Sequence, residues 1–127
     1  MVVCVMFLVG GCAKYTTPRK VEKRIVDGPW KISSFTINGE NVAADYQTYT
    51  FSFSESHNVA VGGTFQASGS WQVGLDKNPT ILYLNFPPVG GLEYLADDWQ
   101  VTEMGKNRMT LARNDSGSSG GKLIFKR

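Results

Sequence analysis

The sequence predicts an all-β domain, an eight-stranded antiparallel up-and-down barrel with a short helical turn before its sixth strand. From residue 28 onward, apolar and polar residues alternate with a period of two, which is typical of half-buried strands. Turn residues interrupt this alternation at short intervals, and the chain contains 14 Gly and 5 Pro. Short connections favour a meander that closes on itself, because closure leaves no unpaired strand edge. A two-sheet sandwich would produce the same strand pattern and is the alternative.

Each predicted element rests on a local pattern. Asn38-Gly39 is typical of a hairpin turn after the first strand. Pro87-Pro88 ends the fifth strand, and the spacing of Leu92 and Leu95 predicts the helical turn that follows. The eight predicted strands cover residues 30–37, 49–53, 59–61, 65–73, 80–86, 99–104, 108–113 and 122–127.

The N-terminal segment reads as an export signal. Residues 1–11 are apolar, and they are too few to span a bilayer as a helix. The following Leu8-Val9-Gly10-Gly11-Cys12 resembles a bacterial lipobox, which implies that Cys12 is lipidated and becomes the first residue of the mature protein. One feature departs from that pattern, since no Lys or Arg precedes Cys12. The alternative is a hydrophobic N-terminal strand with two buried thiols.

We predict that residues 12–27 form the lipidated Cys and a flexible tether, and that residues 28–127 form the domain. Residues 13–27 carry a net charge of +3, whereas residues 28–127 carry −1. This excess could lie against anionic lipid headgroups, or it could mark a solvated spacer. The domain has no basic surface of the kind that binds nucleic acid. We expect an outer-membrane position facing the periplasm.

Several segments in order resemble the small lipocalin-like lipoproteins of Bacteroidetes-type bacteria. The resemblance covers most of residues 28–127 and rests on these segments: Gly28-Pro29-Trp30-Lys31-Ile32, Tyr49-Thr50-Phe51-Ser52-Phe53, Gly69-Ser70-Trp71, Leu84-Asn85-Phe86 and Leu92-Glu93-Tyr94-Leu95-Ala96-Asp97-Asp98-Trp99-Gln100-Val101. It implies that Trp30 plugs the closed end of a barrel. It also implies that an arginine lies across this tryptophan, with Arg127 or Arg113 as the candidate.

The inward-facing positions of such a barrel are rich in aromatic residues. They could line an apolar cavity for a small hydrophobic ligand, or they could simply fill the core. Because Ala67 and Gly69 are small, we expect any cavity to lie beside them. The candidate lining residues are Trp30, Tyr49, Phe51, Phe53, Phe65, Ala67, Gly69, Trp71, Phe86 and Trp99.

The sequence offers no arrangement of residues suited to catalysis. A single His and two Cys exclude a His-based triad and a four-ligand zinc site, and we expect neither a metal nor a cofactor. The function expected is that of a lipid-anchored envelope protein that binds a small hydrophobic ligand. The alternative is a solid-cored structural or protein-interaction module without a ligand. Its contact surface would be the loop that begins at Pro87 and ends at Asp98.

Overall fold

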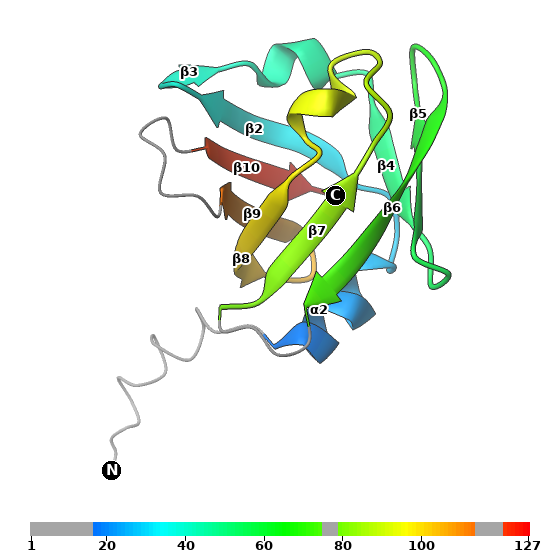
Figure 1. Cartoon of the computed structure of the whole chain (residues 1–127), viewed down its shortest axis with the longest axis vertical. Helices are drawn as coiled ribbons and strands as arrows, with labels where there is room; N and C mark the ends of the chain where they lie inside the picture. Colours follow the sequence, from blue (N-terminus) through cyan, green and yellow to red (C-terminus); the bar gives the residue numbers. More distant parts are fainter. Residues whose placement is uncertain (1–16, 75–78, 114–120) are drawn as a thin grey trace.

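In the computed structural model, which describes residues 17–74, 79–113 and 121–127, the chain forms one antiparallel β-sheet (Figure 1). Helix α2 (Pro18–Ile25) precedes the sheet, and two 3-10 turns, η1 (Ala43–Tyr46) and η2 (Leu92–Tyr94), interrupt it. The nine strands within the described residues run in the order β3-β2-β10-β9-β8-β7-β6-β5-β4. Their bounds are β2 (Lys31–Ile37), β3 (Glu40–Asn41), β4 (Thr50–Phe53), β5 (Asn58–Gly62), β6 (Ala67–Gly74), β7 (Ile81–Asn85), β8 (Asp98–Met104), β9 (Arg108–Arg113) and β10 (Gly121–Lys126).

The all-β, antiparallel character of the fold is confirmed, and each of the eight predicted strands overlaps one of the strands of the sheet. The additional strand is β3, only two residues long, which pairs with the end of β2. The turn between them is the predicted Asn38-Gly39 hairpin, and both residues have positive φ, 53° and 80°. Asn and Gly are the residues that adopt this conformation most readily. The predicted helical turn is η2, which precedes β8.

The sheet does not close into a continuous barrel, which differs from the predicted eight-stranded closure. Its two sides meet at one isolated bridge, where Trp30 and Phe51 exchange two backbone hydrogen bonds of 2.8 Å. Beyond this bridge, β2 meets the returning chain rather than β4. The Phe35 carbonyl accepts from the Val42 amide at 2.7 Å, and the Phe35 amide donates to Asn41 Oδ1 at 3.3 Å. These bonds give both backbone groups of Phe35 partners outside β4, so Phe35 needs no ladder to β4.

The prediction of a flexible tether over residues 12–27 is wrong for residues 18–25, which form α2. Thr17 caps the helix by accepting a hydrogen bond from the Lys20 amide, and Pro18 stands at its first turn. Val21 and Ile25, one helical turn apart, are completely buried in the core. The capping residue and this spacing were both present in the sequence. Cys12 and the predicted signal of residues 1–11 lie outside the described residues.

Trp30 joins α2 to the sheet. Its indole Nε1 donates to the Ile25 carbonyl at 3.0 Å, and the Arg127 guanidinium lies 3.9 Å from its ring centroid. Arg127 also donates to the carbonyls of Arg24 and Gly28, so it ties the C-terminus to the end of α2. Of the two candidate arginines, Arg127 therefore lies over Trp30, whereas Arg113 lies 4.9 Å from the centroid of Trp99.

The opposite end of the sheet is covered by η1 and η2 (Figure 1). Tyr46 of η1 donates to the Gly91 carbonyl at 2.7 Å, and Tyr49 donates to the Gly90 carbonyl at 2.8 Å. Leu92 and Leu95 are completely buried beneath these contacts. We refer to this end, formed by η1, η2 and the loop between β7 and β8, as the capped end.

Candidate functional site

The predicted interior ligand site is occupied by the protein's own side chains. Seven of the ten candidate lining residues have at most 8% of their surface exposed, and all seven belong to one hydrophobic core. Their rings pack edge to face, as in the contacts of Phe51 with Phe86 and Phe125, whose centroids lie 6.0 and 5.3 Å away. These seven residues are Trp30, Tyr49, Phe51, Phe53, Trp71, Phe86 and Trp99.

The gap expected beside Ala67 and Gly69 is filled, so this expectation is wrong. A Cβ atom at Gly69 would lie 2.2 Å from the Asn85 carbonyl oxygen and 2.8 Å from Phe86 Cδ1. Ala67 and Phe65 are partly buried and pack against the core. Glycine at position 69 thus allows β7 and the Phe86 ring to approach β6 closely, and it does not line a cavity.

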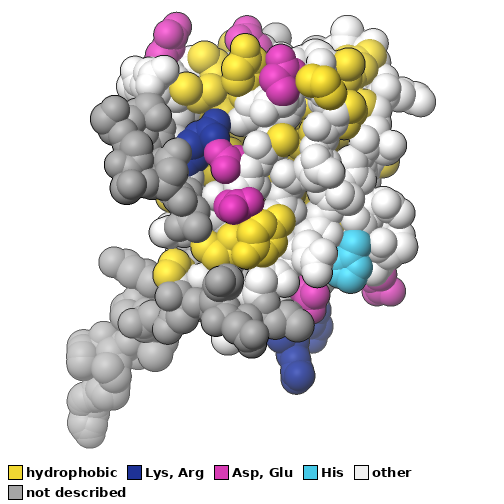
Figure 2. All heavy atoms as spheres, in the orientation of Figure 1, with side chains coloured by type: hydrophobic (Ala, Val, Ile, Leu, Met, Phe, Trp, Pro, Cys, Tyr) yellow, Lys and Arg dark blue, Asp and Glu magenta, His cyan; other side chains and the backbone are white. Residues whose placement is uncertain are grey.

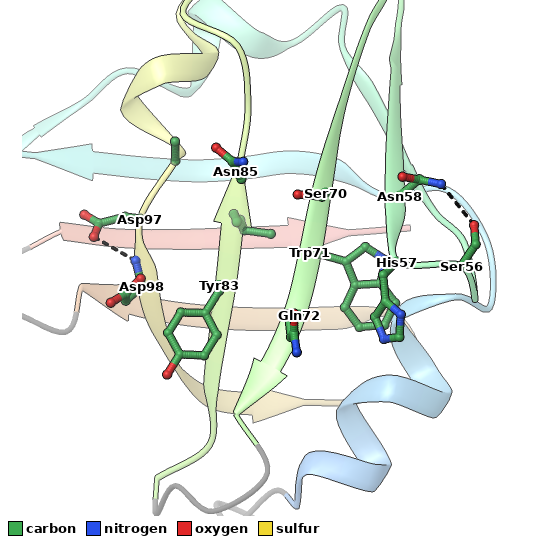
Figure 3. A pocket seen from close by; sticks show the side chains of 12 residues that line it. Ser56, His57, Asn58, Ser70, Trp71, Gln72, Tyr83, Asn85, Asp97 and Asp98 are labelled. Atoms are coloured by element: carbon green, nitrogen blue, oxygen red, sulfur yellow. Dashed lines mark hydrogen bonds between the residues drawn. The ribbon is translucent and has the colours of Figure 1, made fainter.

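A hollow of about 710 Å³ lies on the outer face of the sheet, over β6 and β7 (Figure 3). We call it the polar groove. Ser70 and Gln72 project into it from β6, and Asn85 and Tyr83 project from the paired positions of β7. Tyr83 in turn pairs with Asp98 at the start of β8. The groove is lined by Ser56, His57, Asn58, Ser70, Trp71, Gln72, Tyr83, Leu84, Asn85, Ala96, Asp97 and Asp98.

The two sides of the polar groove are fixed by contacts within the protein. On one side, His57 lies against Trp71 with 4.7 Å between ring centroids, and the Trp71 indole donates to the Ser54 carbonyl at 3.1 Å. On the other side, Asp97 forms an ion pair with Arg113 and accepts from the Asp98 amide. Among the described residues, no Lys or Arg lines the groove. Its described lining therefore offers amides, hydroxyls, carboxylates and the His57 imidazole to a ligand.

The capped end carries a second surface of a different kind. Val89 and Tyr94 are the large hydrophobic residues that remain exposed among the described residues, at 45% and 55%. A hollow of about 320 Å³ lies beside Tyr94, lined by Ile37, Asn38, Glu40, Val42, Asp45, Tyr46, Gly90, Gly91 and Tyr94. We call Val89 and this hollow together the capped-end surface. It includes part of the loop that the sequence suggested as a contact surface.

The capped-end surface is acidic at its rim. Glu40, Asp45 and Glu93 are exposed, and none of them forms an ion pair with a described residue. Burial, followed by the negative charges of Glu93 and Asp45, raises the pKa of Tyr46 to about 12. The Tyr46 phenol is therefore neutral at physiological pH and donates its hydrogen bond to Gly91. Figure 2 shows hydrophobic and acidic side chains together at this end of the molecule.

Within the described residues, no group of three or more His, Cys, Asp and Glu side chains is placed to hold a metal ion. In the same part of the chain, no helix is long and apolar enough to cross a membrane.

The fold and its surfaces define an all-β domain built on a single antiparallel sheet around a filled core. The same fold occurs in a DUF4847 family protein from Bacteroides vulgatus, solved by crystallography, with a TM-score of 0.60. The likeness covers 84% of this chain and 96% of that one, and the two sequences are 16% identical, so it establishes the fold alone. No protein-family model matches the chain, and no curated protein matches it.

Sequence reasoning missed the polar groove. The alternation within β6 and β7 places Ser70, Gln72, Tyr83 and Asn85 on the outer face, but an outer face is ordinarily only solvated. The hollow depends on the walls contributed by the turn at His57 and by Asp97. The alternation of polar and apolar residues within one strand does not predict that the His57 turn and Asp97 lie on either side of β6 and β7.

Proposed function

We propose that this chain is a lipid-anchored protein of the bacterial envelope, held in the outer membrane through Cys12, and that its β-sheet domain is a solid-cored interaction module. The filled interior carries this proposal. Trp30, Phe51 and the other aromatic candidates pack against one another, and the space beside Gly69 is occupied. These contacts argue against a small hydrophobic ligand in the interior of the domain, so we assign binding to the outer surfaces.

A lipocalin-like relationship is part of the proposal. It is supported by the Trp30–Phe51 bridge, which brings the two sides of the sheet together, and by Arg127 over the Trp30 ring. These features match what the sequence resemblance implies for the closed end of a lipocalin barrel. Trp30 and Arg127 both contact the end of α2, the helix that follows the proposed lipidation site in the chain.

The capped-end surface is the proposed contact surface with another envelope protein. It lies at the opposite end of the sheet from α2 (Figure 1), so an anchor upstream of α2 leaves it directed away from the membrane. Exposed Val89 and Tyr94 provide the apolar area. Glu40, Asp45 and Glu93, which form no ion pair with a described residue, surround it. The complementary partner surface is apolar and carries basic groups.

This function is tested in the cells that make the protein. Radiolabelled palmitate should enter the wild-type chain and not the Cys12→Ala variant. A photo-crosslinking amino acid at position 94 should give one discrete protein adduct, whereas the same group at position 52, exposed on β4, should give none. Equal labelling of the Cys12→Ala variant would refute the anchor. Identical crosslinks at both positions, or none at position 94, would refute the contact surface.

The polar groove favours a second candidate function, the binding of a neutral ligand rich in hydroxyl groups, such as a saccharide. The side chains of Gln72 and Asn85 are exposed, and within the described residues neither forms a hydrogen bond to another protein group. Their amides can each donate and accept, and the Tyr83 ring beside them offers an apolar face. Because the groove lies at the centre of the sheet, strand addition by a peptide has no free edge there.

This candidate is tested by NMR titration with maltohexaose, cellohexaose and chitohexaose. At least one of these sugars should shift the side-chain amide signals of Gln72 and Asn85 saturably. Gln72→Ala should then weaken binding about tenfold, because removing a hydrogen-bonding partner of a ligand costs roughly 1–1.5 kcal/mol. Gln66→Ala, outside the groove, should leave the affinity unchanged. Sugars that shift neither amide would exclude this function.

A further inference from the structure

A third hollow, of about 480 Å³, lies at the α2 end of the molecule and is strongly basic. Five cations and one carboxylate line it together with Thr17, and we call it the basic hollow. Its charged lining residues are Arg19, Lys20, Lys23, Arg24, Asp27 and Lys106. None of the five cations forms an ion pair with a carboxylate of a described residue. Its described lining therefore keeps an excess of positive charge.

The fold builds this concentration of charge from two distant segments. Because Val21 and Ile25 are buried, the basic residues of α2 are left on its outer side. Lys106 comes from the turn between β8 and β9, and Arg127 holds this turn beside the helix. Arg127 Nε donates to the Lys106 carbonyl at 2.8 Å, and a terminal nitrogen of the same guanidinium donates to the Arg24 carbonyl at 3.2 Å. The cations are thus held together before any ligand arrives.

The excess of cations lies at the α2 end of the molecule. Acidic side chains lie at the capped end, whereas Lys and Arg side chains, with further acidic side chains near them, lie at the opposite end (Figure 2). An anionic surface consequently attracts the α2 end through the cations of the basic hollow. The interaction is strong only within about a Debye length, roughly 8 Å at physiological ionic strength.

We propose that the basic hollow binds the phosphate headgroups of anionic phospholipids in the membrane that carries the protein. The choice of a lipid rests on the proposed anchor at Cys12. Only four residues separate Cys12 from Thr17, and the five steps between these two positions span at most about 18 Å. A lipidated Cys12 would therefore keep the hollow close to the headgroups, where each Lys or Arg contributes about 1 kcal/mol of attraction. Binding fixes the domain upright, with its capped end directed away from the bilayer.

The test uses the full chain with Cys12→Ala, so that a covalent lipid makes no contribution. Binding is measured on vesicles of phosphatidylcholine alone and on vesicles that contain phosphatidylcholine and phosphatidylglycerol in equal amounts. The ratio of the two affinities is the readout, because it cancels the contribution of the apolar residues 1–11. We expect a ratio of at least about 100 at low salt, which falls as salt is added.

Matched variants assign the effect to the basic hollow. Lys23→Gln should lower the ratio about fivefold, and Lys20→Gln with Lys23→Gln should lower it about 25-fold. Lys122→Gln removes the same charge from β10, outside the hollow, and should change the ratio less than twofold. Equal effects of Lys23→Gln and Lys122→Gln would overturn the proposal, since net charge alone would then explain binding. A ratio near one for the Cys12→Ala chain would also overturn it, whatever palmitate labelling shows for the anchor.

Inorganic phosphate separates the lipid from a free anion. At a phosphate concentration equal to that of the vesicle lipid, it should leave vesicle binding unchanged, because a single phosphate lacks the many charges of a bilayer. Complete displacement under these conditions would reassign the hollow to free phosphate and overturn the lipid proposal.

Discussion

Trp30→Ala should lower the free energy of unfolding by about 3–5 kcal/mol, the usual cost of truncating a fully buried aromatic side chain. Trp30 is completely buried, and it connects three parts of the molecule. Its indole bonds the Ile25 carbonyl of α2, its backbone bridges to Phe51, and its ring lies beneath Arg127. Alanine keeps the backbone bridge but leaves a cavity and an unsatisfied carbonyl. Urea unfolding followed by circular dichroism measures this loss.

Two further variants separate the contributions of Trp30. Trp30→Phe keeps most of the buried ring but loses the hydrogen bond to Ile25, so it should cost less than alanine. Tyr94→Ala removes a large aromatic side chain that is 55% exposed, and it should change stability by less than about 0.5 kcal/mol. If Trp30→Ala were as mild as Tyr94→Ala, Trp30 would not join α2 to the sheet in the way the contacts indicate.

Local pattern predicted most of the strands because half-buried strands impose a period of two. In β4, Phe51 and Phe53 point into the core and Ser52 points out, as the alternation requires. The hairpin at Asn38-Gly39 was predictable because few residues tolerate positive φ at two successive positions. Strand β3 was not predictable, since its two residues, Glu40 and Asn41, carry no alternation of their own.

The errors arose where tertiary contacts decide the outcome. Helix α2 looked like a linker because eight residues with four basic side chains hold only two buried apolar positions, Val21 and Ile25. Such a short helix is stable mainly because it packs against the sheet. Closure of the barrel failed for a similar reason. The carbonyl and amide of Phe35 find partners in Val42 and Asn41, and no sequence pattern shows that choice.

For the candidate site too, the sequence pattern predicted which side chains face inward but not how closely they pack. The sequence identified which aromatic residues face inward, and seven of them are in the core. It did not determine whether they leave a space, because that depends on how closely β6 and β7 approach each other. The close approach at Gly69 is a property of the paired strands, where Ser70 faces Asn85. A small residue in a strand therefore has two opposite meanings, a gap or a tight contact.

Gly69→Ala distinguishes these two meanings, and we expect it to lower the free energy of unfolding by about 1–3 kcal/mol, as overpacking of a filled core does. The new Cβ would meet the Asn85 carbonyl oxygen at 2.2 Å, which belongs to the backbone of β7 and cannot rotate away. Strands β6 and β7 must separate, and the Phe86 ring must move as well. The midpoint of urea unfolding should therefore fall.

Gly62→Ala is the matched control, because it adds the same methyl group on the neighbouring strand β5, where no atom lies within 4 Å of the new Cβ. This variant should be neutral or stabilised by up to about 1 kcal/mol, since alanine restricts the unfolded chain more than glycine does. If the two variants unfolded at the same midpoint, there would be free space beside Gly69. The interior would then be able to admit a small hydrophobic ligand, and the solid-cored interaction module would lose the observation that supports it.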